Sequence, residues 1–227
     1  MIEQSLCDQV KGAPCMCSRY YIDNNIPDEI SALFAGRKNP GLTWTARDIH
    51  PDEKAPIIVR GKTGLSLYEM RWGFPQYSGK GLFINARAET ALQKKTFSES
   101  VLYRRCVIPA RHFYELPKYP AESAGGRFCR RDASKNKVTF LKENSSVLYL
   151  AGFYNLIQDE LRFVVLTTQA NPSVSPVHDR MPLILEADEV ESWICDGSRT
   201  QAFLQKVPLD LQKTQEYEQQ SLFGMLS

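Results

Sequence analysis

Residues 147–168 read VLYLAGFYNLIQDELRFVVLTT. Aliphatic, β-branched and aromatic residues dominate both halves of this stretch, Val147–Leu156 and Leu161–Thr168, and that composition is typical of β-strands. The polar residues between the halves mark the place where one strand ends and the next begins. The stretch therefore predicts a fold whose centre is a β-sheet.

Similar short runs occur on both sides of this stretch. They predict strands at Pro56–Arg60, Leu65–Phe74, Leu82–Asn85, Arg105–Ile108, Lys137–Lys142 and Met181–Glu186. Helical patterns are fewer, and they predict helices at Asp28–Ala35, Thr90–Tyr103, Ala187–Cys195 and Ser198–Lys206. Because helices and strands do not alternate regularly, the sequence favours an α+β fold, a single domain with a largely antiparallel, curved or barrel-like β core and flanking helices.

Length and composition agree with one soluble domain. The chain has 227 residues, 43% of them hydrophobic, which is enough for one substantial core. No segment approaches the run of about 20 apolar residues that crosses a bilayer, and the first residues lack the apolar region of a signal peptide. We expect a cytoplasmic protein, nucleoid-associated if bacterial, with no membrane partner. The segment Pro117–Asn136, rich in Pro, Gly, Ser and charge, predicts a loop insertion.

Charge and cysteine usage restrict the chemistry further. A formal net charge of +2 is too small for wholesale wrapping of a polyanion, so nucleic-acid binding requires a local basic surface. The cysteines fit neither a disulfide framework nor a paired zinc pattern, and we expect free thiols, no metal and no cofactor. They are Cys7, Cys15, Cys17, Cys106, Cys129 and Cys195.

Four short segments combine reactive groups with turn residues or strand ends. They read MCSRYY at 16–21, FINARAET at 83–90, VIPARHFYEL at 107–116 and SPVHDRMP at 175–182. Together and in this order, the segments resemble the SRAP family, the SOS-response-associated peptidases, which crosslink to abasic DNA. The resemblance implies an SRAP-like domain at residues 17–227. Residues 1–16 would then be an N-terminal extension that is removed, or not translated, in the active form.

The resemblance also assigns residues. It implies catalytic roles for Cys17, Asn85, Glu115 and His178, and DNA contacts for Arg19, Arg87 and Arg180. The chain departs from the family pattern in three places. Ser18 replaces a glycine, Leu116 replaces an aromatic residue, and Ala46-Arg47-Asp48 replaces Ala-Pro-Thr.

The chemistry of Cys17 can be argued from the residue itself. An opened abasic sugar exposes an aldehyde, which an amine converts to an imine and a neighbouring thiol then closes to a five-membered thiazolidine. Only an N-terminal cysteine carries both groups at that spacing. Its α-amine, with a reference pKa of about 8, is roughly one third unprotonated at neutral pH, whereas a lysine with a pKa of about 10.4 is almost fully protonated.

The other residues suit supporting roles. Glu115 can move protons during imine formation and ring closure, and His178 can hydrogen-bond or protonate the sugar oxygen during ring opening. Asn85 can orient the aldehyde oxygen or the Cys17 amine. The forked guanidinium groups of Arg19, Arg87 and Arg180 suit phosphate oxygens. In the segment MRWGFP, we expect Trp72, more than Phe74, to stack on a base.

Two rival functions stay open. Cys17 with His178 as base would make a cysteine peptidase, or a peptidase that cleaves its own Met16–Cys17 bond, and a lyase activity could accompany the crosslink. Alternatively, the same pocket could hold an extruded base without catalysis, as a single-stranded DNA-binding module. The expected partner is abasic single-stranded DNA, alone or at a junction with duplex, and the expected state is a monomer. Two origins of a free Cys17 also remain, a translation start at Met16 or cleavage after it.

Overall fold

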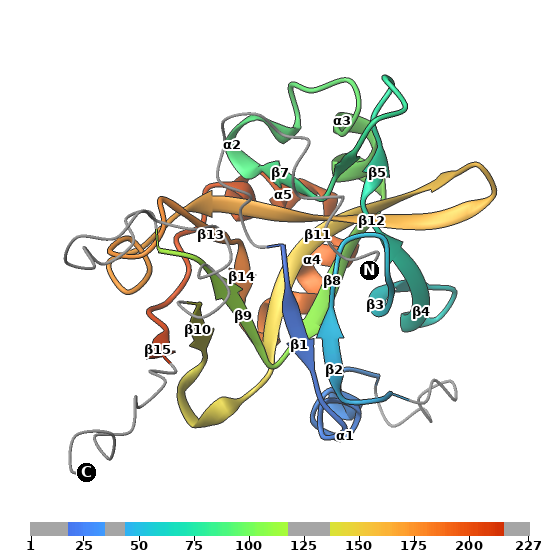
Figure 1. Ribbon diagram of the computed structural model, residues 1–227. Helices are drawn as coiled ribbons and strands as arrows, with labels where there is room; N and C mark the ends of the chain where they lie inside the picture. The colour runs from blue at the N-terminus through green and yellow to red at the C-terminus, as the bar shows by residue number, and fades with distance from the viewer. Residues whose placement is uncertain (1–17, 35–43, 118–136, 216–227) are drawn as a thin grey trace, which may run out of the picture.

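A closed ring of β-strands forms the centre of the computed structural model, which describes residues 18–34, 44–117 and 137–215 (Figure 1). Around the ring, β12 pairs with β4, β4 with β3, β3 with β8, β8 with β11, and β11 again with β12. Among these five pairs of the ring, only β4–β12 is parallel. The predicted α+β fold with a largely antiparallel, barrel-like core is confirmed. The ring strands are β3 (Lys54–Gly61), β4 (Gly64–Trp72), β8 (Arg105–Ala110), β11 (Leu148–Ile157) and β12 (Glu160–Gln169).

The stretch at 147–168 forms the β11–β12 hairpin of this ring. Ile157 pairs with Glu160, so the loop consists of Gln158 and Asp159. Both have positive φ values, 50° and 62°, as two-residue hairpin turns require. Gly152 lies where β11 leaves no room for a side chain, since an added Cβ would come within 2.6 Å of the Val164 carbonyl oxygen of β12.

A second sheet continues from the ring. Its strand order is β15-β10-β9-β1-β2, and β9 follows β8 directly along the chain. In Figure 1, β1 runs in front of β8. The short strands β1, β2 and β15 were not predicted, because three or four residues offer too little alternation to recognise. The strands are β1 (Tyr20–Ile22), β2 (Arg47–Ile49), β9 (His112–Glu115), β10 (Val138–Leu141) and β15 (Gln212–Gln215).

Two of the remaining strands, β7 and β13, flank the second half of β12. Thr167 of β12 pairs with Arg87 of β7 on one side and with Pro182 of β13 on the other. The predicted strand Leu65–Phe74 is interrupted at Gly73, whose φ of 103° suits glycine alone. The chain then forms a separate hairpin of β5 with β6. These strands are β5 (Phe74–Pro75), β6 (Leu82–Phe83), β7 (Asn85–Arg87), β13 (Arg180–Pro182) and β14 (Ile184–Leu185).

The helices are short, and each predicted helix is divided. The prediction of one helix at Thr90–Tyr103 was wrong, because the chain turns at 92–97 and buries Phe97 against Phe153, with 5.4 Å between ring centroids. The α-helices are α1 (Ile26–Glu29), α2 (Ala88–Ala91), α3 (Ser98–Tyr103), α4 (Val190–Cys195) and α5 (Thr200–Leu204). The 3₁₀ turns are Ser31–Phe34, Glu143–Ser145, Ala187–Glu189 and Gly197–Arg199.

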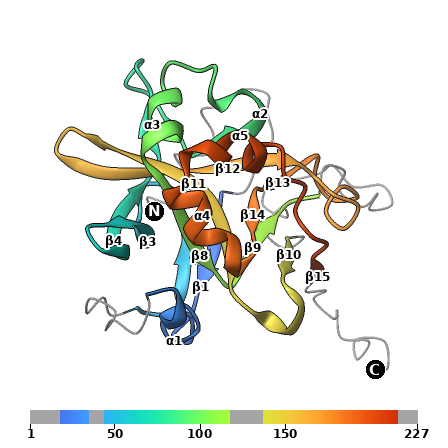
Figure 2. The ribbon, with the colours of Figure 1, turned by 180° about the vertical axis from the view of Figure 1, so that it is seen from behind.

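Arg105 of β8 forms hydrogen bonds that connect helices α3 and α4 to the barrel. Figure 2 shows α4 lying over β8 on the side opposite to β1. The Arg105 side chain is buried and donates to the carbonyl oxygens of Trp193, at 2.6 Å, and Val101, at 3.2 Å. These carbonyls belong to the last turns of α4 and α3, where intrahelical partners are missing. None of the described helices is long and apolar enough to cross a membrane.

Candidate functional site

The pairing of β1 with β9 brings the start of the described chain to Glu115. Tyr20 pairs with Phe113, and the Tyr114 N–H donates to the Arg19 carbonyl oxygen at 3.2 Å. Continued two residues beyond the paired Tyr20, this register leads the backbone of Ser18 toward Glu115. Cys17 precedes Ser18 in the chain but lies outside the described residues, as does most of the predicted loop at Pro117–Asn136.

Glu115 is buried, with 3% of its surface exposed. Side chains alternate along β9, so Phe113 and Glu115 face the interior while His112 and Tyr114 face outward. A buried carboxylate is costly unless other groups compensate its charge, which distinguishes Glu115 from the surface glutamates common in proteins. The structure thus places a carboxyl group inside the fold beside the backbone that leads to Cys17.

Arg19 is held by two groups on the outer face of this sheet. Its guanidinium forms an ion pair with Asp48 of β2 and lies 4.9 Å from the centre of the Tyr114 ring. Burial alone would raise the pKa of the Asp48 carboxyl, but hydrogen bonds from Arg19 and Tyr114 keep that pKa below its ordinary value. Asp48 belongs to the departure Ala46-Arg47-Asp48, so this departure supplies the partner of Arg19.

Asn85 and Arg87 project from β7, which runs parallel to β12. Asn85 is half-buried and Arg87 is exposed. Both line a hollow of about 350 Å³ whose wall also includes Lys94 and Phe97. Two cations therefore stand beside Asn85, and Lys94 is a contributor that the sequence analysis missed.

His178 is buried, with 4% of its surface exposed, and its imidazole is oriented by the backbone of Arg180. The Arg180 N–H lies 3.0 Å from His178 Nδ1. Nδ1 also lies 3.2 Å from the Arg180 carbonyl oxygen, so one tautomer of the ring accepts from the N–H and the other donates to the carbonyl. In either tautomer the Arg180 backbone holds Nδ1, which fixes the direction of Nε2.

The Arg180 guanidinium is itself held by Glu89 of α2. It donates to both carboxylate oxygens of Glu89, at 2.5 and 2.8 Å, and to the Thr167 carbonyl oxygen at 2.7 Å. Hydrogen bonds from Arg180 hold the pKa of Glu89 below its ordinary value, against the effect of partial burial. Glu89 was not predicted as a site residue, although it lies in the same FINARAET segment as Asn85 and Arg87.

Trp72 is a core residue, and the expectation that it stacks on a base was wrong. None of its surface is exposed, so no ring face is open to a base. Its ring lies 5.2 Å from Tyr20 and its Nε1 donates to the Ile84 carbonyl oxygen at 2.9 Å. Trp72 therefore connects β1, which follows Cys17, to the backbone that precedes Asn85. Phe74 is buried as well.

Tyr77 is the exposed aromatic residue of this segment. It lies in the turn of the β5–β6 hairpin and is 91% exposed. The turn closes through hydrogen bonds from Gln76 N–H to the Gly81 carbonyl oxygen, at 3.1 Å, and from Gly79 N–H to the Gln76 carbonyl oxygen, at 2.9 Å. A sequence signal for Tyr77 existed, because an aromatic residue in a turn rich in Gly, Ser and Lys is unlikely core material.

The site thus has two parts that meet through Trp72. One is the β1–β9 pair with Glu115, and the other is the group of Asn85, Arg87, His178 and Arg180 around β12. Within the described ranges, no group of three or more His, Cys, Asp or Glu side chains is placed to hold a metal ion.

Comparison with known proteins finds relatives of this chain. The model of the family described as SOS response associated peptidase (SRAP) matches residues 16–221. Abasic site processing protein YoaM of Bacillus subtilis is 28% identical, over 91% of this chain and 92% of its own length. The Escherichia coli protein YedK, also named an abasic site processing protein, is 25% identical over 65% of this chain and 63% of its own length.

Solved structures share the fold. A protein from Bordetella bronchiseptica matches with a TM-score of 0.66 at 22% identity, over 87% of this chain and 98% of that one. A protein from Bacteroides thetaiotaomicron matches with a TM-score of 0.63 at 18% identity, over 83% of this chain and 86% of that one. Because the family model covers almost the whole chain and the motifs occur in order, this chain belongs to the SRAP family.

Proposed function

We propose that this protein bonds covalently to abasic sites in single-stranded DNA through Cys17, once the α-amine of Cys17 is free. The observation that carries the proposal is the buried Glu115 on β9, the strand that pairs with β1 shortly after Cys17 in the chain. The names of the relatives support it, because several are called abasic site processing proteins. We propose a monomer as the active unit and abasic single strands, or their junctions with duplex, as substrates.

The reaction has three steps whose atoms balance. The sugar ring opens, and its ring oxygen becomes a hydroxyl while C1′ becomes an aldehyde. The Cys17 amine then attacks the aldehyde, and water leaves as the imine forms. Finally the thiol sulfur adds to the imine carbon and its proton passes to the nitrogen, which closes the thiazolidine. No oxidant, reductant or cofactor is required.

Each site residue has a defined task in this scheme. His178 donates a hydrogen bond from Nε2 to the sugar oxygen during ring opening. Glu115 transfers protons at the Cys17 amine and at the departing water. Asn85 orients the aldehyde oxygen.

The DNA contacts expected from the sequence need refinement. Arg87 and Lys94 line one hollow and suit phosphate oxygens. Arg19 and Arg180 already bind carboxylates, so we propose that they position neighbouring site residues. We assign base stacking to Tyr77 instead of Trp72, because a stacking platform needs an exposed ring.

The peptidase alternative would use the other tautomer of His178. A general base for a cysteine thiol needs a ring nitrogen with a lone pair directed at sulfur. Nδ1 of His178 lies 3.0 Å from the Arg180 nitrogen and 3.2 Å from the Arg180 carbonyl oxygen, so with the proton on Nδ1 the lone pair of Nε2 could accept a proton from a thiol. Lyase activity and self-cleavage after Met16 remain secondary proposals for the same site.

The test uses protein that begins at Cys17 and a single strand containing one abasic site. We expect an adduct that survives heat and denaturant without borohydride, with the DNA mass on Cys17. Cys17→Ser should leave at most a labile imine, and Cys195→Ser serves as the matched control and should crosslink normally. Stable adducts formed equally by Cys17→Ser, or DNA attached to another residue, would refute the proposal.

A further inference from the structure

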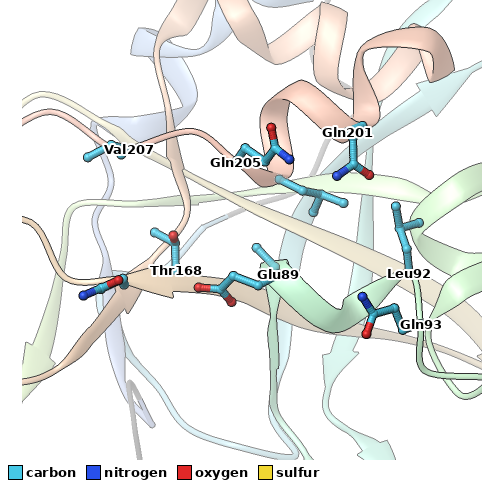
Figure 3. Close-up of a pocket in the computed structure, with 10 residues that line it drawn as sticks. Glu89, Leu92, Gln93, Thr168, Gln201, Gln205 and Val207 are labelled. Atoms are coloured by element: carbon cyan, nitrogen blue, oxygen red, sulfur yellow. The ribbon is translucent and has the colours of Figure 1, made fainter.

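A second hollow lies on the other side of α2 from the Asn85 hollow. It has a volume of about 420 Å³ and is bounded by α2, the end of β12 and α5 (Figure 3). In Figure 3, Gln201 of α5 and Gln205, which directly follows α5, lie on one side, while Glu89 and Gln93 come from the opposite side. This volume lies in the range of about 300–1,000 Å³ in which proteins bind small organic groups.

Carboxamide side chains dominate the polar lining of this hollow. They belong to Gln93, Gln169, Gln201 and Gln205. Leu92 and Leu204 add apolar surface. A carboxamide presents a donor and an acceptor side by side, which matches the hydrogen-bonding edge of a nucleobase, and apolar side chains pack against the face of the base.

Charge distinguishes the two hollows. The Asn85 hollow contains Arg87 and Lys94, whereas no lysine or arginine is among the described residues that line the glutamine hollow, and Glu89 contributes a carboxylate there. A phosphate is therefore favoured in the first hollow, whereas in the second it meets no cation among the described lining residues, since Arg180 is already paired with Glu89. An uncharged base with polar edges suits the second.

Helix α2 forms the ridge between the hollows. Arg87 and Thr90 face the Asn85 hollow, while Ala88 and Glu89 face the glutamine hollow. A strand whose abasic sugar lies at Asn85 has to cross only this single helical turn to place a neighbouring base among the glutamines. The same helix bears Glu89, which holds Arg180, so an occupied glutamine hollow adjoins the group that orients His178.

We propose that the glutamine hollow, formed by Glu89, Gln93, Gln169, Gln201 and Gln205, binds the nucleobase of a nucleotide next to the abasic one in the same strand. The inference rests on the proposed function, because it assumes abasic single-stranded DNA as the ligand. It adds a specificity site, since the protein then recognises a missing base by binding a base that is present beside it.

The test measures equilibrium binding to single strands with a tetrahydrofuran residue at the abasic position, which has no aldehyde and cannot crosslink. In a second set of strands, each flanking nucleotide in turn is also replaced by tetrahydrofuran, so that a base is lost and the phosphate charge is kept. We expect the parental protein to lose about tenfold in affinity at one flanking position, as for loss of one well-formed base contact. The double variant Gln201→Ala/Gln205→Ala should bind the strand with a single tetrahydrofuran about tenfold more weakly than the parental protein does. Its affinity should not fall further when the base at that flanking position is also removed.

Two further variants complete the experiment. Gln93→Ala changes a residue on the opposite wall of the hollow. Like the double variant, it should bind with an affinity that does not depend on the flanking base. Gln212→Ala changes an exposed glutamine of β15 outside the hollow and should behave as the parental protein. Thermal unfolding of every variant establishes that it is folded. A parental protein indifferent to every flanking base, or folded glutamine variants as sensitive to the base as the parent, would overturn the proposal.

A parallel crosslinking assay on strands that carry the aldehyde separates this inference from the proposed function. If the protein crosslinks but no flanking base affects binding, the glutamine hollow does not bind a base and the proposed crosslinking function stands. If a flanking base affects binding but no crosslink forms, the hollow binds a base in a non-covalent DNA-binding module and the proposed crosslinking function is wrong.

Discussion

The backbone N–H of Arg180 donates a hydrogen bond to Nδ1 of His178, with 3.0 Å between the two nitrogens. The Arg180 carbonyl oxygen lies 3.2 Å from the same nitrogen, so the Arg180 backbone holds Nδ1 in either tautomer and fixes the direction of Nε2. The contact is itself fixed by the guanidinium of Arg180, which Glu89 and the Thr167 carbonyl hold in place. A chain of contacts thus runs from the surface carboxylate of Glu89 to the buried imidazole.

The first prediction concerns the Nε2 donor. His178→Ala should slow crosslinking by about 10²–10⁴-fold under single-turnover conditions, the usual contribution of a positioned acid or base. His178→Gln, whose side chain also carries a donor nitrogen, should retain more of the rate than His178→Ala. Affinity for a tetrahydrofuran strand should stay nearly unchanged in both. If the two variants crosslink at the parental rate, hydrogen bonding by His178 does not limit ring opening.

The second prediction concerns Glu115. Glu115→Gln keeps the shape of the side chain but removes its ability to exchange a proton, so crosslinking should slow by about 10²-fold or more while DNA binding persists. Glu191→Gln, on an exposed position of α4, is the matched control. Single-turnover rates and binding isotherms provide the two readouts. Parental crosslinking by a folded Glu115→Gln protein would show that its proton-transfer role is wrong.

The third prediction concerns Glu89. Glu89→Gln should reduce the crosslinking rate by about tenfold without abolishing it, because Arg180 then loses its carboxylate partner and His178 loses part of its orientation. The pKa of Glu89 is lowered in the folded protein, so its ion pair stabilises the fold above the unfolded-state pKa of about 4.3. That contribution disappears as the pH falls through the lowered value.

Thermal unfolding between about pH 2 and pH 7 checks the linkage. The melting temperature of the parental protein should exceed that of Glu89→Gln near neutrality, and the two curves should converge in acid. A difference that stays constant down to the lowest pH would mean that the Glu89–Arg180 pair is not what the substitution removes.

The fourth prediction concerns the cations beside Asn85. Arg87→Ala should weaken binding to single-stranded DNA and lower the slope of log affinity against log salt by about 0.7, the value for one phosphate contact in a single strand. The crosslinking rate at saturating DNA should change little. Lys62→Ala, an exposed cation in the β3–β4 turn, controls for net charge. An unchanged salt slope for Arg87→Ala would exclude the phosphate contact.

The central strands could be predicted from sequence because they are buried and long. The runs at Val147–Leu156 and Leu161–Thr168 became β11 and β12 almost unchanged. The short strand β1 could not be predicted, because its formation depends on pairing with β2 and β9, which are distant in the chain. A periodicity over three residues carries no such information.

Side-chain environments were the least predictable part of the site. Trp72 was expected to stack on a base, but its indole lies in the core, and the chain turns at Gly73 immediately after it. The same turn starts the hairpin that exposes Tyr77. Glu89 acquires its role only because β7 and β13 both pair with β12, which brings α2 beside Arg180. A contact such as Glu89–Arg180 depends on which strands pair in the folded protein, so no local pattern in the sequence indicates it.

The last prediction concerns the α-amine of Cys17. With Met16 attached, this nitrogen belongs to a peptide bond, and its lone pair is delocalised into the carbonyl. It is then neither basic nor nucleophilic, so imine formation and thiazolidine closure cannot occur. A protein whose residues 1–16 are retained should therefore form no stable adduct, whereas the form that begins at Cys17 should form one.

The comparison needs a chain in which residues 1–16 stay attached, verified by intact mass before and after incubation with abasic DNA. It is measured beside the Cys17-first form and its Cys17→Ser variant, at equal concentration of folded protein. Binding to a tetrahydrofuran strand tells whether the extension blocks the chemistry alone or also the DNA site. A heat-stable adduct from the verified full-length chain would show that another group attacks the aldehyde, because no route to a thiazolidine exists from an acylated nitrogen.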